Sequence, residues 1–166
     1  MLQQAGVSLP VKLDLLTFND PDILQAAEVI QSMAKDAGFD VHIQAMEFAS
    51  TLQTAQRGDY QAYMIGWSGR VDIDGNTYAF LHTGQGNNWS HYSNPTVDTL
   101  LDEGRGMTDI AKRRAVYADM WTQERQDLPI TYLWIPRNIV GMSAKLNGFR
   151  PVPDGMIRVQ GLEMAK

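Results

Sequence analysis

The chain has 166 residues, of which 44% are hydrophobic and 20% are charged, proportions that are ordinary for a globular protein. Its formal net charge is −5 and its 14 basic residues are scattered along the sequence, so neither nucleic acid nor an anionic membrane surface is expected as a partner. Cysteine is absent, which excludes disulfides, thiol catalysis and thiolate metal sites.

The first six residues resemble the end of a helix. Residues 1–5 are typical of a last helical turn, and Gly6 is the glycine that would end it. A chain that starts inside the end of a helix is expected to be part of something longer. We therefore expect this sequence to be a piece of a larger protein.

The first half of the chain predicts alternating strands and helices. Asp20 can cap a helix that begins at Pro21, and Gly38 would end it. Apolar residues inside that helix recur at i, i+3, i+4 and i+7, which marks the face toward a core. Strands are predicted over residues 11–18, 39–46 and 60–65, and a second helix over residues 49–56. Strands and helices that alternate at this spacing are typical of an α/β layer.

The second half predicts mainly helices. Ser93-Asn94-Pro95 is a cap followed by a proline, which favours a helix start. Residues 83–91 form a polar loop, Pro129 would end the last long helix, and the chain from Lys145 on is expected to be mostly irregular. Helices are predicted over residues 74–82 and 108–126, with a third starting at Pro95, and short strands over residues 130–135 and 138–142.

The segment from Gly66 to Asn76, Gly-Trp-Ser-Gly-Arg-Val-Asp-Ile-Asp-Gly-Asn, is the best candidate for a ligand site. It follows a predicted strand, and loops at strand ends run over the surface and carry function. Trp67 beside Arg70 can clasp a small organic molecule and hold its carboxylate. A bidentate contact of this kind contributes on the order of 1.5–3 kcal/mol. The alternative is a plain interaction module, in which Trp67 belongs to the core and Arg70 is a solvated charge.

The same segment is similar to the nucleophile elbow of serine hydrolases. In Gly66-Trp67-Ser68-Gly69, however, the second glycine comes one residue too early for G-x-S-x-G. A catalytic triad would also need His82 or His91 as its base. Ser68 is more simply explained as a turn residue that bonds its own backbone. A small serine hydrolase that uses Ser68 remains an alternative function.

A metal site is not expected. Asp72-Ile73-Asp74-Gly75-Asn76 resembles the start of a calcium loop, but the sixth position is Thr77 instead of glycine and the twelfth is Thr83 instead of glutamate. Asp72 or Asp74 is better explained as a cap of the helix that follows. The histidines show no metal spacing; they are His42, His82 and His91. We therefore predict no metal and no cofactor.

Five segments, taken in order, resemble one known family. They are Gln4-Ala5-Gly6, Gly66 to Asn76, Tyr92-Ser93-Asn94-Pro95-x-Val97-Asp98-x-Leu100-Leu101, Arg114-x-x-Tyr117 and Asp127-Leu128-Pro129-Ile130. Singly these segments are weak, but their order and spacing are specific. Together they are similar to the second lobe of the peptide-binding family of ABC-importer substrate-binding proteins, solute-binding protein family 5. The resemblance covers nearly the whole chain.

This resemblance implies one lobe of a periplasmic-binding-protein-like (type II) fold, which is α/β with a mixed sheet and flanking helices. Residues 1–166 would form a single C-terminal lobe, and residues from about 130 to 166 would return toward a missing N-terminal lobe. The family closes two lobes on a ligand without catalysis and delivers the ligand to the membrane permease of an ABC importer. A periplasmic or extracytoplasmic location is implied as well.

Arg70 departs from the pattern of the dipeptide-type members, in which the matching position is an aspartate that holds the ligand's α-ammonium. A guanidinium repels an ammonium and attracts a carboxylate, so the sequence resembles the glutathione-type subgroup. A peptide, a glutathione-like molecule or an organic acid is the implied ligand. The implied ligand-binding residues are Trp67, Ser68, Arg70, Asp72 and Asp74. Pockets bury roughly 70–90% of a ligand, so we expect this lobe to bind weakly or not at all on its own.

Overall fold

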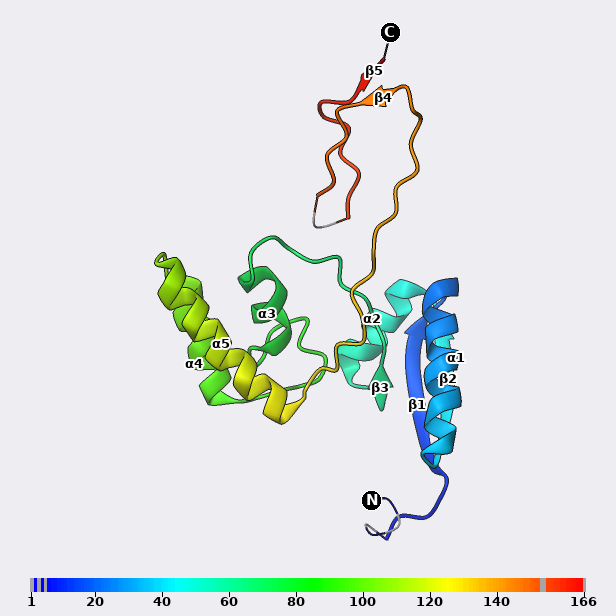
Figure 1. The fold of residues 1–166 in the computed structure, drawn as a ribbon. Coiled ribbons are helices and arrows are strands. Elements are labelled where there is room, and N and C mark those ends of the chain that lie inside the picture. Colours follow the sequence, from blue (N-terminus) through cyan, green and yellow to red (C-terminus); the bar gives the residue numbers. More distant parts are fainter. Residues whose placement is uncertain (1, 3, 5, 153–154, 166) are drawn as a thin grey trace. The chain divides into compact units, whose positions relative to one another are not determined.

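The computed structural model describes residues 2, 4, 6–152 and 155–165 (Figure 1). The chain divides into two compact units, Met1–Trp67 (unit 1) and Ser68–Lys166 (unit 2). The helix end expected over residues 1–6 depends on residues 1, 3 and 5, which lie outside the described residues. Within the described part, no helix combines the length and the apolar composition needed to cross a membrane.

Unit 1 contains a three-stranded parallel sheet and two helices (Figure 1). Its elements are β1 (Val11–Phe18), α1 (Pro21–Asp36), β2 (Phe39–Met46), α2 (Phe48–Arg57) and β3 (Ala62–Tyr63). The strand order is β2-β1-β3, which makes β1 the central strand. Strands β1 and β2 pair along their whole lengths, from Val11 opposite Phe39 to Phe18 opposite Met46. The predicted order of strands and helices in this half of the chain is confirmed.

Helix α1 begins where the sequence predicts it. The Asp20 side chain accepts hydrogen bonds from the backbone N–H groups of Asp22 and Ile23, each at 3.1 Å. These N–H groups have no partner inside the helix, so the cap satisfies them. The inner face of α1 buries Ala27 completely, in a core cluster with Leu15, Val41 and Met64. The cap and the apolar stripe therefore place the helix on the sheet together.

The third strand is shorter than the predicted residues 60–65. Strand β3 has two residues and pairs with the middle of β1. The pairing is extended by the Met64 N–H, which donates to the Leu16 carbonyl at 2.9 Å. The Thr17 hydroxyl in turn donates to the Met64 carbonyl at 3.1 Å. An apolar run shows which residues are buried, whereas the length of a ladder depends on the neighbouring strand.

Unit 2 is mainly helical. Its elements are α3 (Asp74–Leu81), α4 (Pro95–Gly106), α5 (Ile110–Asp127), β4 (Leu146–Asn147) and β5 (Glu163–Met164). Asn94 caps α4 and Asp109 caps α5 through their side-chain oxygens. A buried cluster joins the three helices and consists of Leu81, Val97, Leu101, Tyr117 and Met120. Gly104 allows α4 to approach α5 closely, because an added Cβ would lie 2.8 Å from Cε2 of Tyr117.

The strands predicted over residues 130–135 and 138–142 are not formed, and this prediction was wrong for the structure. Residues 131–143, all of them described, form neither helix nor strand. Several of their large apolar side chains are exposed; these are Tyr132, Leu133, Trp134, Ile135, Ile139, Val140 and Met142. Aromatic and β-branched residues favour strands only where a neighbouring strand completes the ladder. Strands β4 and β5 instead form a short antiparallel ribbon in the region expected to be irregular.

Candidate ligand-binding site

The candidate loop runs across the division between the two units. Trp67 is the last residue of unit 1 and 46% of it is exposed, so it does not belong to the core. Ser68 and the residues after it belong to unit 2. Four of the five predicted site residues therefore lie in unit 2: Ser68, Arg70, Asp72 and Asp74.

Arg70 and Asn76 close the loop by a pair of hydrogen bonds. The Arg70 backbone N–H donates to Oδ1 of Asn76 at 2.7 Å, and Nδ2 of Asn76 donates to the Arg70 carbonyl at 2.7 Å. The same Nδ2 also donates to the carbonyl of Asp72 at 3.0 Å. One amide side chain therefore holds three main-chain groups of the loop. Asn76 was not among the predicted site residues.

Two glycines shape the loop around Arg70. Gly69 has φ +79°, which is the left-handed region that side chains other than glycine rarely adopt. Gly75 lies against the side chain of Arg70, because a Cβ added at Gly75 would lie 3.0 Å from both Cβ and Cγ of Arg70. Glycine at position 75 thus leaves room for the aliphatic stem of the arginine.

The guanidinium of Arg70 is turned toward the loop's own oxygens. Its Nη1 donates to the Gly69 carbonyl at 2.7 Å and to Oγ of Ser68 at 3.2 Å. Both acceptors are oxygens of the same loop, so these two bonds orient the guanidinium. Arg70 is exposed in the structure. The loop therefore offers an oriented cation at the surface of unit 2.

Asp72 forms a bidentate ion pair with Arg113 of α5. Nη2 of Arg113 donates to Oδ1 at 2.7 Å and Nη1 donates to Oδ2 at 2.9 Å. Oδ1 of Asp72 also accepts from the N–H of Asp74, the first residue of α3, at 2.8 Å. The bonds from Arg113 and from the Asp74 backbone hold the pKa of Asp72 below its usual value. The carboxylate thus satisfies the first N–H of α3. The predicted capping was wrong, because the N-cap residue of α3 is Ile73, which makes no side-chain cap bond.

Asp74 is paired with a second arginine. Nε of Arg105 donates to Oδ1 of Asp74 at 3.1 Å, and Nη2 donates to Oδ2 at 3.0 Å. The guanidinium of Arg105 also lies 3.4 Å from the centre of the Tyr78 ring. Both predicted carboxylates therefore face cations from unit 2, one from α4 and one from α5. These two arginines were missed by the sequence analysis because nothing in their spacing links them to the loop.

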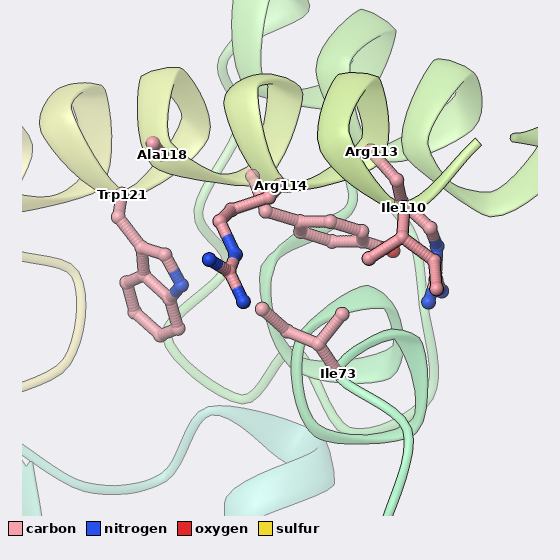
Figure 2. Close-up of a pocket in the computed structure, with 7 residues that line it drawn as sticks. Ile73, Ile110, Arg113, Arg114, Ala118 and Trp121 are labelled. Atoms are coloured by element: carbon pink, nitrogen blue, oxygen red, sulfur yellow. The ribbon is translucent and has the colours of Figure 1, made fainter.

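An open pocket of about 370 Å³ lies between α5 and the residue that precedes α3 (Figure 2). Its lining is mostly apolar and comprises Ile73, Ile110, Arg113, Arg114, Tyr117, Ala118 and Trp121. Figure 2 shows the guanidinium of Arg114 between Trp121 and Ile73. The pocket shares Ile73 and Arg113 with the anchoring of the loop. The sequence feature that could have indicated this pocket is the recurrence of lining residues every three or four positions along α5.

Among the described residues, those considered for serine-hydrolase or metal chemistry lack the partners that such chemistry needs. In the described part of the chain, Oγ of Ser68 has Arg70 as its hydrogen-bond partner, and a guanidinium cannot serve as a general base. His82 lies 3.8 Å from a carboxylate oxygen of Asp98 and 3.6 Å from one of Asp102. No cluster of three or more His, Cys, Asp or Glu side chains suited to a metal ion occurs among the described residues.

Comparison with known proteins gives one family. The sequence profile of the bacterial extracellular solute-binding proteins, family 5 Middle, matches residues 1–89. The oligopeptide-binding protein AppA of Bacillus subtilis is 26% identical over 132 residues, which cover 76% of this chain and 24% of AppA. The nickel-binding protein NikA of Staphylococcus aureus is 25% identical over 150 residues, which cover 89% of this chain and 30% of NikA. The chain thus spans 24% to 30% of the length of these two relatives.

Solved structures share the fold. A putative peptide-binding protein AppA from Clostridium difficile matches with a TM-score of 0.83 and 22% identity, over 98% of this chain and 35% of that one. AppA of Bacillus subtilis, solved with a nonapeptide, matches with a TM-score of 0.81 and 23% identity, over 93% of this chain and 32% of that one. The predicted α/β fold of the type II periplasmic-binding-protein class is confirmed.

Proposed function

The chain belongs to the bacterial extracellular solute-binding proteins of family 5, and from that premise we propose that it forms the C-terminal lobe of the solute-binding component of an ABC importer. The ligand would lie between this lobe and an N-terminal lobe, and the loaded protein would deliver it to a membrane permease. The place of action would be periplasmic or extracytoplasmic. The lengths of the matched relatives, several times that of this chain, support a second lobe.

The ligand we propose is a small solute with a carboxylate, of the kind bound by the glutathione-type subgroup. The observation that carries this proposal is the exposed guanidinium of Arg70, which two oxygens of its own loop hold in a fixed orientation. A guanidinium binds a carboxylate through two parallel N–H···O bonds. Two relatives are named as binding an oligopeptide and nickel. Of these ligands, the peptide carries a terminal carboxylate that would pair with Arg70.

The five predicted site residues take different roles in this proposal. Arg70 would bind the carboxylate, and the half-exposed indole of Trp67 would contact the apolar part of the ligand. Ser68 would orient the guanidinium through the bond that it accepts. Asp72 and Asp74 would hold the loop in place, because each is already engaged by an arginine of unit 2.

We propose further that binding is not followed by catalysis. The hydroxyl of Ser68 is bonded to a guanidinium, and an activated serine needs a base at hydrogen-bonding distance. The matched relatives are named as binding proteins. Replacement of Ser68 by alanine should therefore weaken ligand binding modestly and abolish no reaction. Turnover of an ester or amide substrate that disappears with Ser68→Ala would contradict this.

The exposed apolar segment over residues 131–142 would be covered in the two-lobed protein. We propose that the chain from about residue 130 to 166 returns toward the N-terminal lobe. Exposed side chains such as Ile135, 93% exposed, and Ile139, 94% exposed, support this, because contiguous apolar surface marks an interface. Amide exchange in residues 131–142 should be slow in the full-length protein and fast in this chain alone. Equal exchange rates in the two would contradict it.

A thermal-shift titration of the full-length protein tests the ligand class. The ligands would be short peptides, glutathione and simple organic acids, each paired with its carboxamide derivative. A ligand at a hundred times its dissociation constant stabilises a protein by about 2.7 kcal/mol, which shifts the melting temperature visibly. We expect shifts that require a free carboxylate. Equal shifts with the carboxamides, or no shift with any of them, would contradict the proposed ligand class.

A further inference from the structure

We propose that Asn76 is the positioning residue for Arg70, the cation that binds the ligand. Asn76 fixes the main chain of Arg70 and so determines where the guanidinium meets a carboxylate. This inference rests on the proposed function and adds a specific residue to it. Asn76 itself would not touch the ligand. Its effect on affinity and on ligand choice would pass through Arg70.

The hydrogen bonds of Asn76 account for both polar groups of the Arg70 peptide backbone. The N–H of Arg70 donates to Oδ1, and its carbonyl accepts from Nδ2, both at 2.7 Å. Because both groups are bound by one rigid amide, rotation of the backbone at Arg70 breaks at least one bond. The third bond, from Nδ2 to the Asp72 carbonyl at 3.0 Å, fixes the amide against the other side of the loop.

The amide is carried by a well-anchored helix. Asn76 is the third residue of α3. The next residue, Thr77, is completely buried and donates from its hydroxyl to the Ile73 carbonyl at 2.9 Å. At the other end of α3, Leu81 is completely buried in the core cluster of unit 2. Sites held by rigid elements keep their geometry better than sites on free loops, and Asn76 transfers the rigidity of α3 to Arg70.

Gly75 lies against the side chain of Arg70, as Asn76 holds its backbone. The Cβ and Cγ atoms of Arg70 lie where a side chain at position 75 would begin, with 3.0 Å to an added Cβ. The aliphatic stem of Arg70 therefore rests against the first turn of α3. The backbone of Arg70 is hydrogen-bonded to Asn76, the residue after Gly75. Residues 75 and 76 together define both the start and the direction of the arginine side chain.

An amide side chain offers a donor and an acceptor in the same plane. Asn76→Asp would keep an acceptor for the Arg70 N–H but remove the donor to the two carbonyls. Asn76→Ala would remove both. Asn87 is the matched control, because it lies in a loop of the same unit and its side chain makes no hydrogen bond within the described part of the chain.

The first test needs no ligand. Amide exchange of Arg70 is measured by NMR in the wild-type chain and in the variants Asn76→Ala and Asn87→Ala. We expect Asn76→Ala to speed exchange of the Arg70 amide by about tenfold or more while the amides of Thr77 and Leu81 keep their protection. Unchanged exchange at Arg70 would overturn the inference, as would loss of protection along the whole of α3, which would show a merely structural role.

The second test uses a double-mutant cycle in the full-length protein, with trialanine and its C-terminal amide as probes. We expect wild type to prefer the free carboxylate, and Asn76→Ala and Asn76→Asp to lower that preference by about tenfold. In an Arg70→Gln background, Asn76→Ala should change nothing further. If Arg70→Gln alone has no effect, or wild type binds neither probe, the proposed function fails and takes this inference with it. If Arg70→Gln weakens binding and Asn76→Ala does not, only the role of Asn76 is overturned.

Discussion

Asp72 and Arg113 are 41 positions apart in the chain, yet two hydrogen bonds of 2.7 and 2.9 Å join their side chains. Arg113 also donates from Nε to the carbonyl of Gly104 at 2.9 Å, so this one arginine connects the loop before α3 with both α4 and α5. The loop that presents Arg70 is therefore tied to the helical core of unit 2. Its geometry and the stability of that unit should change together.

Asp72→Asn tests the ion pair between Asp72 and Arg113 through the pH dependence of the melting temperature. The pKa of Asp72 in the folded state is lowered by the bonds from Arg113 and from the Asp74 backbone, below an ordinary value of 3.8. Stability from a lowered carboxyl pKa is present above the unfolded-state pKa and is lost as the pH falls through the folded-state pKa. We expect the variant to melt about 2–4 °C below wild type at pH 7, and we expect this difference to narrow as the pH falls toward 2.

The control for this comparison is Asp119→Asn, since Asp119 is an exposed carboxylate on α5 whose side chain makes no hydrogen bond or ion pair to the described residues. Its melting temperature should equal that of wild type at pH 7 and at pH 2. A constant difference between Asp72→Asn and wild type from pH 7 to pH 2 would show that the ion pair is not the cause of the change.

Glu124→Gln should stabilise unit 2 at neutral pH. The Glu124 side chain is 1% exposed, and its Oε1 has no hydrogen-bond partner among the described residues. Burial raises the pKa of this carboxyl, and the charge of Arg125 only partly opposes the shift. A raised carboxyl pKa gives stability at low pH that is lost as the pH rises through the folded-state pKa. Glutamine carries no charge at any pH, so the variant should gain about 1 kcal/mol at pH 7.

Denaturant unfolding at pH 4 and pH 7 measures this gain. The two proteins should be closer in stability at pH 4, where the carboxyl of wild type is protonated. Glu103→Gln on the exposed face of α4 serves as the matched control and should leave stability unchanged at both pH values. A variant that is less stable than wild type at pH 7 would mean that the ionised carboxylate is satisfied in solution.

Gly104→Ala should destabilise unit 2, although alanine favours helices. The added Cβ would lie 2.8 Å from Cε2 and 3.0 Å from Cζ of Tyr117, a buried ring between α4 and α5. Overpacking of this kind costs about 1–3 kcal/mol. At Gly106 in the same helix, an added Cβ meets nothing within 4 Å. Gly106→Ala should therefore be neutral or slightly stabilising in the same unfolding experiment, and equal effects of both changes would contradict the close packing.

The sequence was sufficient for the parts of the fold that depend on local signals. Asp20 and Pro21 mark the start of α1, and the alternation in residues 39–46 marks β2, because capping and periodicity act between residues that are near in the chain. Local signals were not sufficient for the segment over residues 130–142. Its composition favours strands, but a strand needs a neighbour, and no local pattern says whether that neighbour is present.

The candidate site shows the same division. The contact between Ser68 and Arg70 could be expected, since the two residues are near neighbours in the chain. The partners of the two carboxylates could not, because Arg105 and Arg113 reach them only after α4 and α5 have packed. Asn76 is near in sequence, but its bonds to Arg70 depend on the backbone shape that Gly69 and Gly75 allow.

The most direct test of the account is the affinity of the full-length protein for trialanine, measured by calorimetry with Arg70→Gln and with Arg150→Gln as the control. Arg150 is an exposed arginine of unit 2, far in sequence from the loop. We predict that Arg70→Gln weakens binding about tenfold or more, that its loss is small for the C-terminal amide, and that Arg150→Gln binds like wild type. Equal affinity of Arg70→Gln and wild type for the free carboxylate would contradict the central claim that Arg70 binds the ligand.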